Sequence, residues 1–149
     1  EALKIPHDKL EGLYGLGFSL YENGKYDDAI NIFRLLMMID KFDYRFAFGL
    51  AACFQLAEKP LEAATTYMIA STLDPKNPMP HFHSSECYTS LKEPTSICIS
   101  LGLCIKTIGD RKEYEALKLR CELLKDKITK KIKSTSKKNK LKKTKKGKK

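Results

Sequence analysis

The sequence lacks the features of a secreted or membrane-spanning protein. Its five cysteines are odd in number and form no Cys-x-x-Cys pair, which fits free thiols in a reducing cytosol better than a disulfide framework. The longest apolar run without a charge, residues 46–54, is too short to cross a bilayer. Charged residues occupy the start of the chain, where a signal peptide needs an apolar core. We therefore expect no membrane span, no secretion signal and a cytoplasmic location.

The short motifs of common enzymes are also missing. The sequence contains no Walker motif, no His-Glu-x-x-His motif and no Gly-x-Ser-x-Gly motif. Gly12, Gly15 and Gly17 do not form a phosphate loop, because they lie in a helical pattern and follow no predicted strand. We expect a protein that is not an enzyme, and we assign it no catalytic residue, no metal and no cofactor.

Acidic residues are missing from the C-terminal end, and this changes the meaning of the net charge. The chain carries a formal charge of +10, but residues 130–149 hold twelve of the 28 basic residues and none of the 18 acidic ones. The rest of the chain is therefore mildly acidic. With few apolar side chains, the end of the chain cannot bury enough surface to order itself, and we predict a disordered Lys-rich tail over residues 134–149. The tail is either simply solvated or contacts acidic partners, anionic lipid or nucleic acid without reading sequence.

What the sequence does contain is an internal repeat of 34 residues. Within each repeat, apolar residues recur every three or four positions, which is the period of a helix and not of a strand. Pro60 and Pro94 suit the first turn of a helix, so each repeat is predicted to be a helix, a tight turn and a second helix. A small residue lets the two helices approach, and a bulky residue fills the space beside it. The positions that repeat in this way are Gly17, Ala51 and Ser85, which are small, and Phe33, Tyr67 and Leu101, which are large.

This pattern resembles the tetratricopeptide repeat and predicts an all-α solenoid of three tandem helix pairs. The first copy matches that repeat at Leu13, Leu16, Gly17, Leu20, Ala29, Phe33 and Asp40. The predicted units are an N-terminal flank (1–9), three repeats (10–43, 44–77 and 78–109) and a C-terminal capping helix (110–133). The capping helix has one apolar stripe, which closes the last repeat or, alternatively, forms a dimer seam.

Residues 81–88, HFHSSECY, are rich in the side-chain types that metal sites and catalytic sites use: two histidines, a glutamate and a cysteine. His83 and Cys87 are four apart and would share a helix face, as two metal ligands would. No second Cys/His pair with ligand spacing occurs elsewhere, and a Cys–His nucleophile would lack an orienting third group. Because Ser84 and Ser85 fall on packing positions of the repeat, we interpret the stretch as scaffold, the first helix of the third repeat.

The inner surface of such a solenoid is lined by the first helix of each pair and is the usual binding surface of repeat proteins. The inner-face positions of this chain are more aromatic than a solvated surface requires. They predict an apolar groove for an extended peptide with Pro or Leu anchors. The alternative is that a terminal helix folds back over them. The predicted groove residues are Tyr14, Phe18, Tyr21, Arg45, Phe48, Ala52, Phe82 and Glu86.

Three stretches are similar to the class II chaperones of bacterial type III secretion, of the low-calcium-response protein H type. They are residues 13–26 (LYGLGFSLYENGKY), residues 43–53 (DYRFAFGLAAC) and the element Pro-x-Pro-x-Phe-His-x-x-Glu-Cys at residues 78–87. The third stretch is far more distinctive than the generic repeat, and it includes HFHSSECY. The Lys-rich extension departs from the usual pattern of this family.

The resemblance implies that the groove binds extended, unfolded segments of hydrophobic translocator proteins, commonly with a Pro-x-Leu-x-x-Pro core. It implies sequestration of these segments in the bacterial cytoplasm before secretion, with Arg45 bonding to peptide carbonyls. Family members are often homodimers. A homodimer is therefore one possible state of this chain. Because the chain begins at Glu1 and not at methionine, we expect a trimmed N-terminus, without the dimer contacts that an N-terminal segment would make. The alternatives are a generic tetratricopeptide repeat adaptor and a factor that binds nucleic acid or an anionic surface through its tail.

Overall fold

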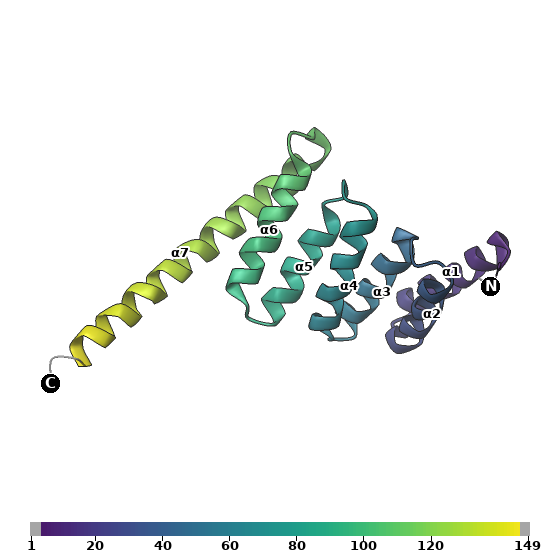
Figure 1. Cartoon of the computed structure of the whole chain (residues 1–149), viewed down its shortest axis with the longest axis horizontal. Helices are drawn as coiled ribbons and strands as arrows, with labels where there is room; N and C mark the ends of the chain where they lie inside the picture. Colours follow the sequence, from purple (N-terminus) through teal and green to yellow (C-terminus); the bar gives the residue numbers. More distant parts are fainter. Residues whose placement is uncertain (1–3, 147–149) are drawn as a thin grey trace.

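The computed structural model describes residues 4–146, and Figure 1 shows helices that follow one another as a row of antiparallel pairs. Each helix packs chiefly against its neighbours along the chain. The predicted all-α solenoid of three helix pairs with a C-terminal helix is therefore confirmed. The pairs are α1 (His7–Glu22) with α2 (Tyr26–Ile39), α3 (Tyr44–Leu56) with α4 (Pro60–Leu73), and α5 (Met79–Ser90) with α6 (Pro94–Ile108); a 3-10 turn, η1 (Lys112–Tyr114), leads into α7 (Glu115–Lys146).

The turn inside each pair has the same backbone structure three times. Gly24, Glu58 and Lys92 lie 34 positions apart and have φ values of 72°, 58° and 58°. In each turn the N–H of this residue donates to the carbonyl three positions earlier, and the next N–H donates to the carbonyl five positions earlier. This arrangement is the Schellman motif, which satisfies the last carbonyls of a helix. The 34-residue period of the sequence therefore also appears in the backbone conformation of the turns.

Bulky residues at the repeating positions form the core of each pair. Phe33, Tyr67 and Leu101 are 2%, 1% and 0% exposed. Burying a side chain of this size stabilises the fold by about 1.5–3 kcal/mol relative to leaving it exposed. The repeating small residues Gly17 and Ala51 are buried beside them. The core thus uses the size alternation that the 34-residue period predicted.

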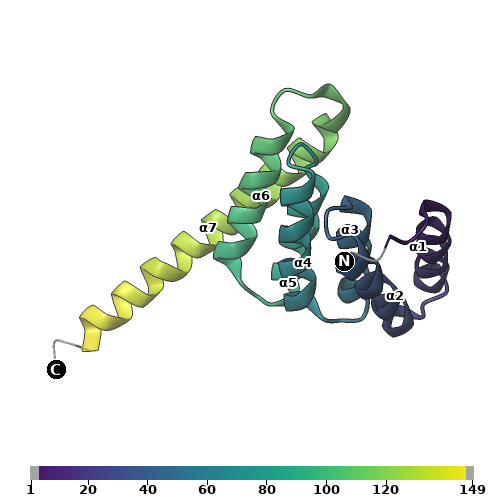
Figure 2. The same cartoon turned by 45° about the vertical axis from the view of Figure 1, so that its right-hand side comes forward.

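Helix α7 covers the last pair and then continues beyond it. Its Cys121 lies with Sγ 3.7 Å from Sγ of Cys104 in α6, and its Thr129 hydroxyl lies 3.8 Å from Sγ of Cys98. Past this region α7 projects away from the repeats (Figures 1 and 2). In residues 4–146, none of the helices combines the length and apolar character that a membrane span needs.

The sequence predicted a disordered tail from residue 134, but the structure continues α7 as helix through Lys146. Residues 147–149 of the predicted tail lie outside the described residues. Lysine is a good helix former, and no proline or glycine interrupts the segment before residue 147. A helix that is already packed on α6 needs no new nucleation to grow, so each added residue contributes a hydrogen bond without the cost of a first turn. Compositional reasoning about the tail as a separate segment missed this continuity.

Candidate functional site

A hollow of about 270 Å³ lies between α1 and α3, with the buried ring of Phe33 from α2 at its base. We term it the aromatic groove, and its lining residues are Tyr14, Phe18, Tyr21, Phe33, Tyr44, Arg45, Phe48, Gly49 and Ala52. The structure therefore brings together the predicted residues of the first two repeats. Sequence reasoning missed Phe33, Tyr44 and Gly49, because it treated the first as core only and did not assign the other two to the inner face.

Aromatic rings form the walls of the aromatic groove in ordered pairs. Phe18 and Tyr21 of α1 are stacked with their centroids 6.3 Å apart, and Tyr44 and Phe48 of α3 are stacked at 5.4 Å. The hydroxyl of Tyr44 accepts a hydrogen bond of 3.0 Å from Nδ2 of Asn77, in the turn before α5. Such contacts hold the rings in place before a ligand arrives, which reduces the entropy lost on binding.

The Phe33 ring can lie at the base of the groove because Gly49 has no side chain. A Cβ atom at Gly49 would lie 2.7 Å from Cζ of Phe33, closer than real carbon atoms approach. A Cβ atom at Gly17, on the other side of the same ring, would lie 3.1 Å from Cε2 of Phe33. The two glycines therefore let α1 and α3 hold the Phe33 ring between them. A glycine inside a predicted helix is the signal from which Gly49 could have been found, since its entropic cost requires a packing reason.

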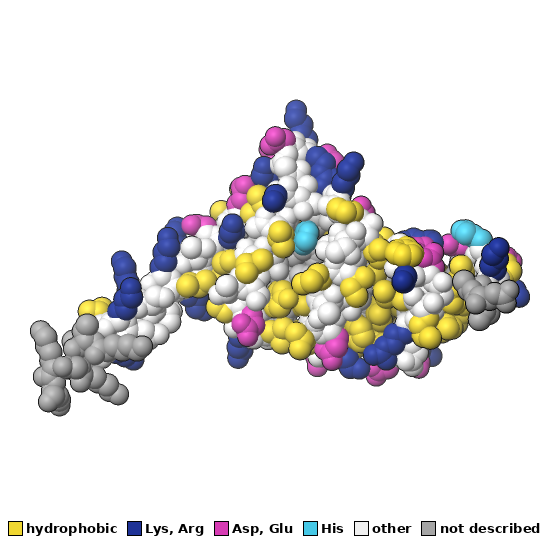
Figure 3. Space-filling view, in the orientation of Figure 1, with side chains coloured by type: hydrophobic (Ala, Val, Ile, Leu, Met, Phe, Trp, Pro, Cys, Tyr) yellow, Lys and Arg dark blue, Asp and Glu magenta, His cyan; other side chains and the backbone are white. Residues whose placement is uncertain are grey.

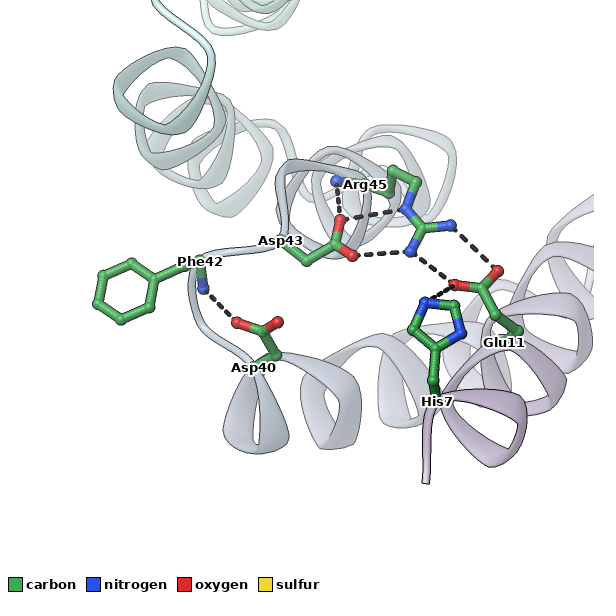
Figure 4. A network of polar contacts seen from close by, with 6 residues as sticks. All are labelled: His7, Glu11, Asp40, Phe42, Asp43 and Arg45. Carbon is green, nitrogen blue, oxygen red and sulfur yellow. Dashed lines mark hydrogen bonds and ion pairs between the residues drawn. The ribbon is translucent and has the colours of Figure 1, made fainter. Parts of the chain in front are cut away.

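Arg45 closes one end of the aromatic groove through a network of charges (Figure 4). Its Nη1 and Nη2 donate to the Glu11 carboxylate at 3.1 and 2.8 Å, and its Nε and Nη2 donate to the Asp43 carboxylate at 3.2 and 2.8 Å. The guanidinium carbon also lies 4.9 Å from the centre of the Tyr14 ring. These contacts join α1 to the N-terminus of α3, where the Asp43 side chain caps the helix.

The charges of this network reinforce one another. The hydrogen bonds from Arg45 lower the pKa of Glu11 and the pKa of Asp43, while the two carboxylates raise the pKa of Arg45. A guanidinium has five N–H donors, and four are committed here to carboxylates. We expected Arg45 to bond to peptide carbonyls, but only one of its N–H donors, on Nη1, remains for such a bond. In the structure its main contacts are to the two carboxylates and the neighbouring rings.

Phe82 and Glu86, predicted to share the groove, instead line a second and larger hollow of about 910 Å³ between α5, α6 and α7. We term it the basic trough. Its apolar floor is formed by Phe82, Ile97, Leu101, Leu124, Ile128 and Ile132. Its basic side chains are Lys92, Arg120, Lys127 and Lys131, and Figure 3 shows Lys and Arg side chains spaced along α7 as it leaves the repeats.

The placement of Phe82 corrects one prediction. Its side chain is 5% exposed and belongs to a core cluster with Leu101 of α6 and Cys121 of α7. The Arg120 guanidinium covers its ring at 5.0 Å from the ring centre. The alternative in which a terminal helix folds over the inner face therefore holds for Phe82. It does not extend to the aromatic groove, whose lining residues in the described chain all come from α1, α2 and α3.

The stretch HFHSSECY forms a polar bridge between the two hollows. Nδ1 of His83 lies 2.8 Å from Oε2 of Glu86, and the same oxygen accepts a 3.1 Å hydrogen bond from Nε2 of Gln55 in α3. The Tyr67 hydroxyl donates to Oε1 of Gln55 at 2.8 Å, and the His83 ring stacks on the Tyr67 ring at 5.4 Å. The His83 bond is the largest of the effects that lower the pKa of Glu86. The network ties α5 to α3 and α4.

The thiols near this network have the properties of core residues. Burial raises the pKa of Cys53 to about 12 and the pKa of Cys87 to about 11, so both are protonated near neutral pH. A protonated thiol is a poor nucleophile and a poor metal ligand. In the described part of the chain, no group of three or more His, Cys, Asp and Glu side chains is placed to hold a metal ion. The geometry thus agrees with the interpretation of Cys87 as scaffold.

Comparison with known sequences gives consistent matches over most of the chain. Residues 10–43 match the tetratricopeptide repeat model. Over 117 residues the chain is 36% identical to low calcium response locus protein H of Yersinia pestis, a match that covers 78% of this chain and 70% of that protein. Over 114 residues it is 29% identical to chaperone protein SicA of Salmonella typhimurium, covering 76% of this chain and 67% of that protein.

Comparison with solved structures gives the same fold with bound peptides. The Yersinia enterocolitica type III secretion chaperone SycD, in complex with a peptide of the translocator YopD, has a TM-score of 0.79 and 34% identity, over 86% of this chain and 98% of that one. PcrH, a Pseudomonas aeruginosa protein crystallised in complex with the chaperone binding region of PopD, has a TM-score of 0.79 and 31% identity, over 86% and 96%.

Proposed function

This chain belongs to the low-calcium-response protein H family of type III secretion chaperones, and we propose that it holds an extended segment of a translocator protein in its aromatic groove. The observation that carries the proposal is the groove itself, an apolar hollow with ordered aromatic walls between α1 and α3. Relatives with the same fold form complexes with translocator peptides. The groove gives this chain the surface for the same task.

The chemistry of the groove suits apolar side chains on an extended backbone. Tyrosine and phenylalanine offer wide contact surfaces and lose little rotamer freedom when a ligand orders them. Leucine and proline anchors of a Pro-x-Leu-x-x-Pro segment would be removed from water there, at about 25 cal/mol for each Å² of apolar surface that is buried. The Tyr21 and Tyr44 hydroxyls and the remaining N–H of Arg45 offer polar partners for the backbone of the segment.

The proposed mechanism is sequestration and involves no bond chemistry. An apolar translocator segment left free in water would aggregate or enter a membrane prematurely, and a bound segment is withheld from both. We place this step in the bacterial cytoplasm before secretion, and we propose that the protein is not an enzyme. Groups that would support catalysis are instead committed to structure, as the protonated thiol of Cys87 and the hydrogen-bonded carboxylate of Glu86 illustrate.

A fluorescence titration with a labelled Pro-x-Leu-x-x-Pro peptide tests the proposal. The informative variant is Phe18→Glu, which places a charge in the groove at a side chain that is 46% exposed, so the fold tolerates it. The matched control is Leu16→Glu, on the same helix and 48% exposed but outside the groove lining. We expect Phe18→Glu to raise the Kd by at least about tenfold, equivalent to about 1.4 kcal/mol, and Leu16→Glu to change it less than about twofold.

Two outcomes would count against the proposal. Equal weakening by both variants would place the peptide elsewhere on α1 or make its binding nonspecific. Failure of the unmodified chain to bind the peptide, combined with binding of a folded partner that Phe18→Glu leaves unchanged, would favour a generic repeat adaptor.

A further inference from the structure

The basic trough shares none of its lining residues with the aromatic groove, and α7 gives it a different chemistry. Along α7, the residues that line the trough form one stripe from Arg120 to Ser136, at positions 120, 124, 127–128, 131–132 and 135–136. At 1.5 Å per residue this stripe is about 24 Å long. Its far end, at Ile132, Thr135 and Ser136, lies beyond Thr129, which contacts Cys98 near the start of α6. The trough is therefore long: α5 and α6 face α7 along its first part, and α7 alone extends it at the far end.

The floor of the channel is apolar. Phe82 and Leu101 form its deepest part and are almost fully buried. Leu124 is 37% exposed, so the α7 side of the floor still faces solvent. A surface helix normally buries an apolar stripe of this kind against a neighbouring element. The exposed part of the stripe is thus available for contact with a further apolar surface.

The edges of the channel are strongly basic. Lys92, Arg120, Lys127 and Lys131 line it, and the acidic group among its lining residues is Glu86. The Glu86 carboxylate already forms contacts with His83 and Gln55, so its negative charge is partly compensated within the protein. The sequence contains no acidic residue after Asp126, and Asp126 is paired with Lys130 at 2.7 Å. The field in the channel therefore favours acidic side chains.

From this combination we propose that the basic trough binds an acidic amphipathic helix of a partner protein. The helix would lay apolar residues, spaced at i, i+3, i+4 and i+7, on the floor and direct Asp or Glu side chains to the lysines on the edges. Helix-in-groove binding of this type uses apolar anchors for affinity and flanking charges for orientation. The proposal is independent of the aromatic groove and does not require the same partner.

Other occupants fit the channel less well. Single-stranded nucleic acid is bound largely through stacking of its bases on exposed aromatic rings, and the one aromatic ring among the lining residues, Phe82, is buried. A flat bilayer surface cannot reach the deepest part of the trough, where Phe82 and Leu101 are almost fully buried. The chain's own Lys-rich end carries the same charge as the edges of the channel. The acidic helices of a second copy bury their apolar faces in their own repeats, as Ala29 and Ile30 of α2 do.

A binding titration on the full chain tests the proposal. The probe is a labelled 16-residue peptide with leucine at i, i+3, i+4 and i+7 and glutamate on both flanks, and its control carries lysine in place of each glutamate. The variant pair is Lys127→Glu with Lys131→Glu, in the trough. The matched pair is Lys133→Glu with Lys137→Glu, on the same helix with the same spacing and charge change but outside the lining residues.

We expect the acidic peptide to bind saturably and the basic peptide not to bind. Charge reversal at residues 127 and 131 should raise the Kd by at least tenfold, while reversal at 133 and 137 should raise it less than threefold. Leu124→Gln should weaken binding at least fivefold, and Leu123→Gln, at a neighbouring exposed leucine outside the trough, should leave it unchanged. Phe18→Glu should have no effect, which separates this site from the aromatic groove.

The proposal is overturned if both charge-reversal pairs weaken the acidic peptide equally, because binding would then follow the overall charge of α7. It is also overturned if Leu124→Gln has no effect, or if the acidic peptide does not bind the unmodified chain. Displacement of the peptide by a short DNA duplex, with a duplex affinity that depends on residues 133 and 137, would reassign α7 to nucleic acid.

Discussion

Arg45 and Glu11 lie 34 positions apart, one full repeat, and form a bidentate ion pair with Nη2 and Oε1 2.8 Å apart. Equivalent positions of successive repeats are therefore neighbours in space. The ion pair fixes α1 against α3 at the end of the aromatic groove, and Figure 4 shows that Asp43 and His7 complete the cluster. A bidentate arginine contact with two carboxylates constrains geometry more than a single exposed pair does.

We predict that replacing Arg45 with methionine lowers thermal stability in a pH-dependent manner. Arg45 lowers the pKa of Glu11 from its ordinary value of 4.5 and that of Asp43 from 3.8. Groups with a lowered folded-state pKa stabilise the fold above their unfolded pKa and lose this contribution as the pH falls through the folded pKa. The Tm of Arg45→Met should thus lie below that of the original chain by the largest amount near pH 7, and the difference should shrink as the pH falls below about 4.5.

A control separates charge from packing in this measurement. The methionine side chain retains much of the contact that the Arg45 stem makes with Tyr14, so a gap in Tm that stays constant down to pH 2.5 would attribute the loss to packing. Lys59→Met breaks the exposed pair of Lys59 and Asp27 at 3.5 Å and should change Tm little at any pH.

Gly49→Ala should destabilise the fold by about 1–3 kcal/mol, the usual range for overpacking, because the new methyl group collides with Phe33. The matched substitution is Gly15→Ala, where a Cβ would meet nothing within 4 Å and helix propensity improves by up to about 1 kcal/mol. Urea unfolding followed by circular dichroism measures both. Equal stability of the two variants would show that Phe33 moves aside at no cost.

The turn residues offer a test of the backbone period. Glu58 has a positive φ of 58°, near the 72° of Gly24, but it carries a side chain, which is unfavourable in this conformation. We predict that Glu58→Gly stabilises the protein by up to about 1 kcal/mol and that Gly24→Ala destabilises it by about 1 kcal/mol. Thermal unfolding of the two variants checks both signs. A loss of stability in Glu58→Gly would mean that the entropy of glycine in the unfolded chain outweighs the relief of strain.

The interpretation of HFHSSECY as scaffold came from its register in the repeat, and the structure supplies the contacts. Ser84 and Ser85 are buried at the predicted packing positions, and Cys87 is 1% exposed. The bond between His83 and Glu86 follows from their spacing of three on one helix. The bond between Glu86 and Gln55 could not be predicted from spacing, because it depends on how far α5 is rotated against α3.

The positions of the inner-face residues could likewise be predicted only in part. Tyr14, Phe18 and Phe48 could be assigned to one groove because the first two repeats keep the regular pattern. Phe82 holds the corresponding place in the third repeat, yet α7 crosses over it and makes it core. The path of α7 across the last pair is a long-range feature that the pattern of one repeat does not encode.

The helical period, the three pairs, the turns at intervals of 34 residues and the family could all be predicted from the sequence, because they depend on local spacing and on side-chain size at fixed positions. Three features could be seen only in the folded chain: Glu11 pairs with Arg45, the Phe33 ring packs against Gly49, and α7 covers the third repeat, so that the inner face holds an aromatic groove and a separate basic trough. Those outcomes depend on the angles at which the helices pack, and these are set by contacts among residues far apart in the chain.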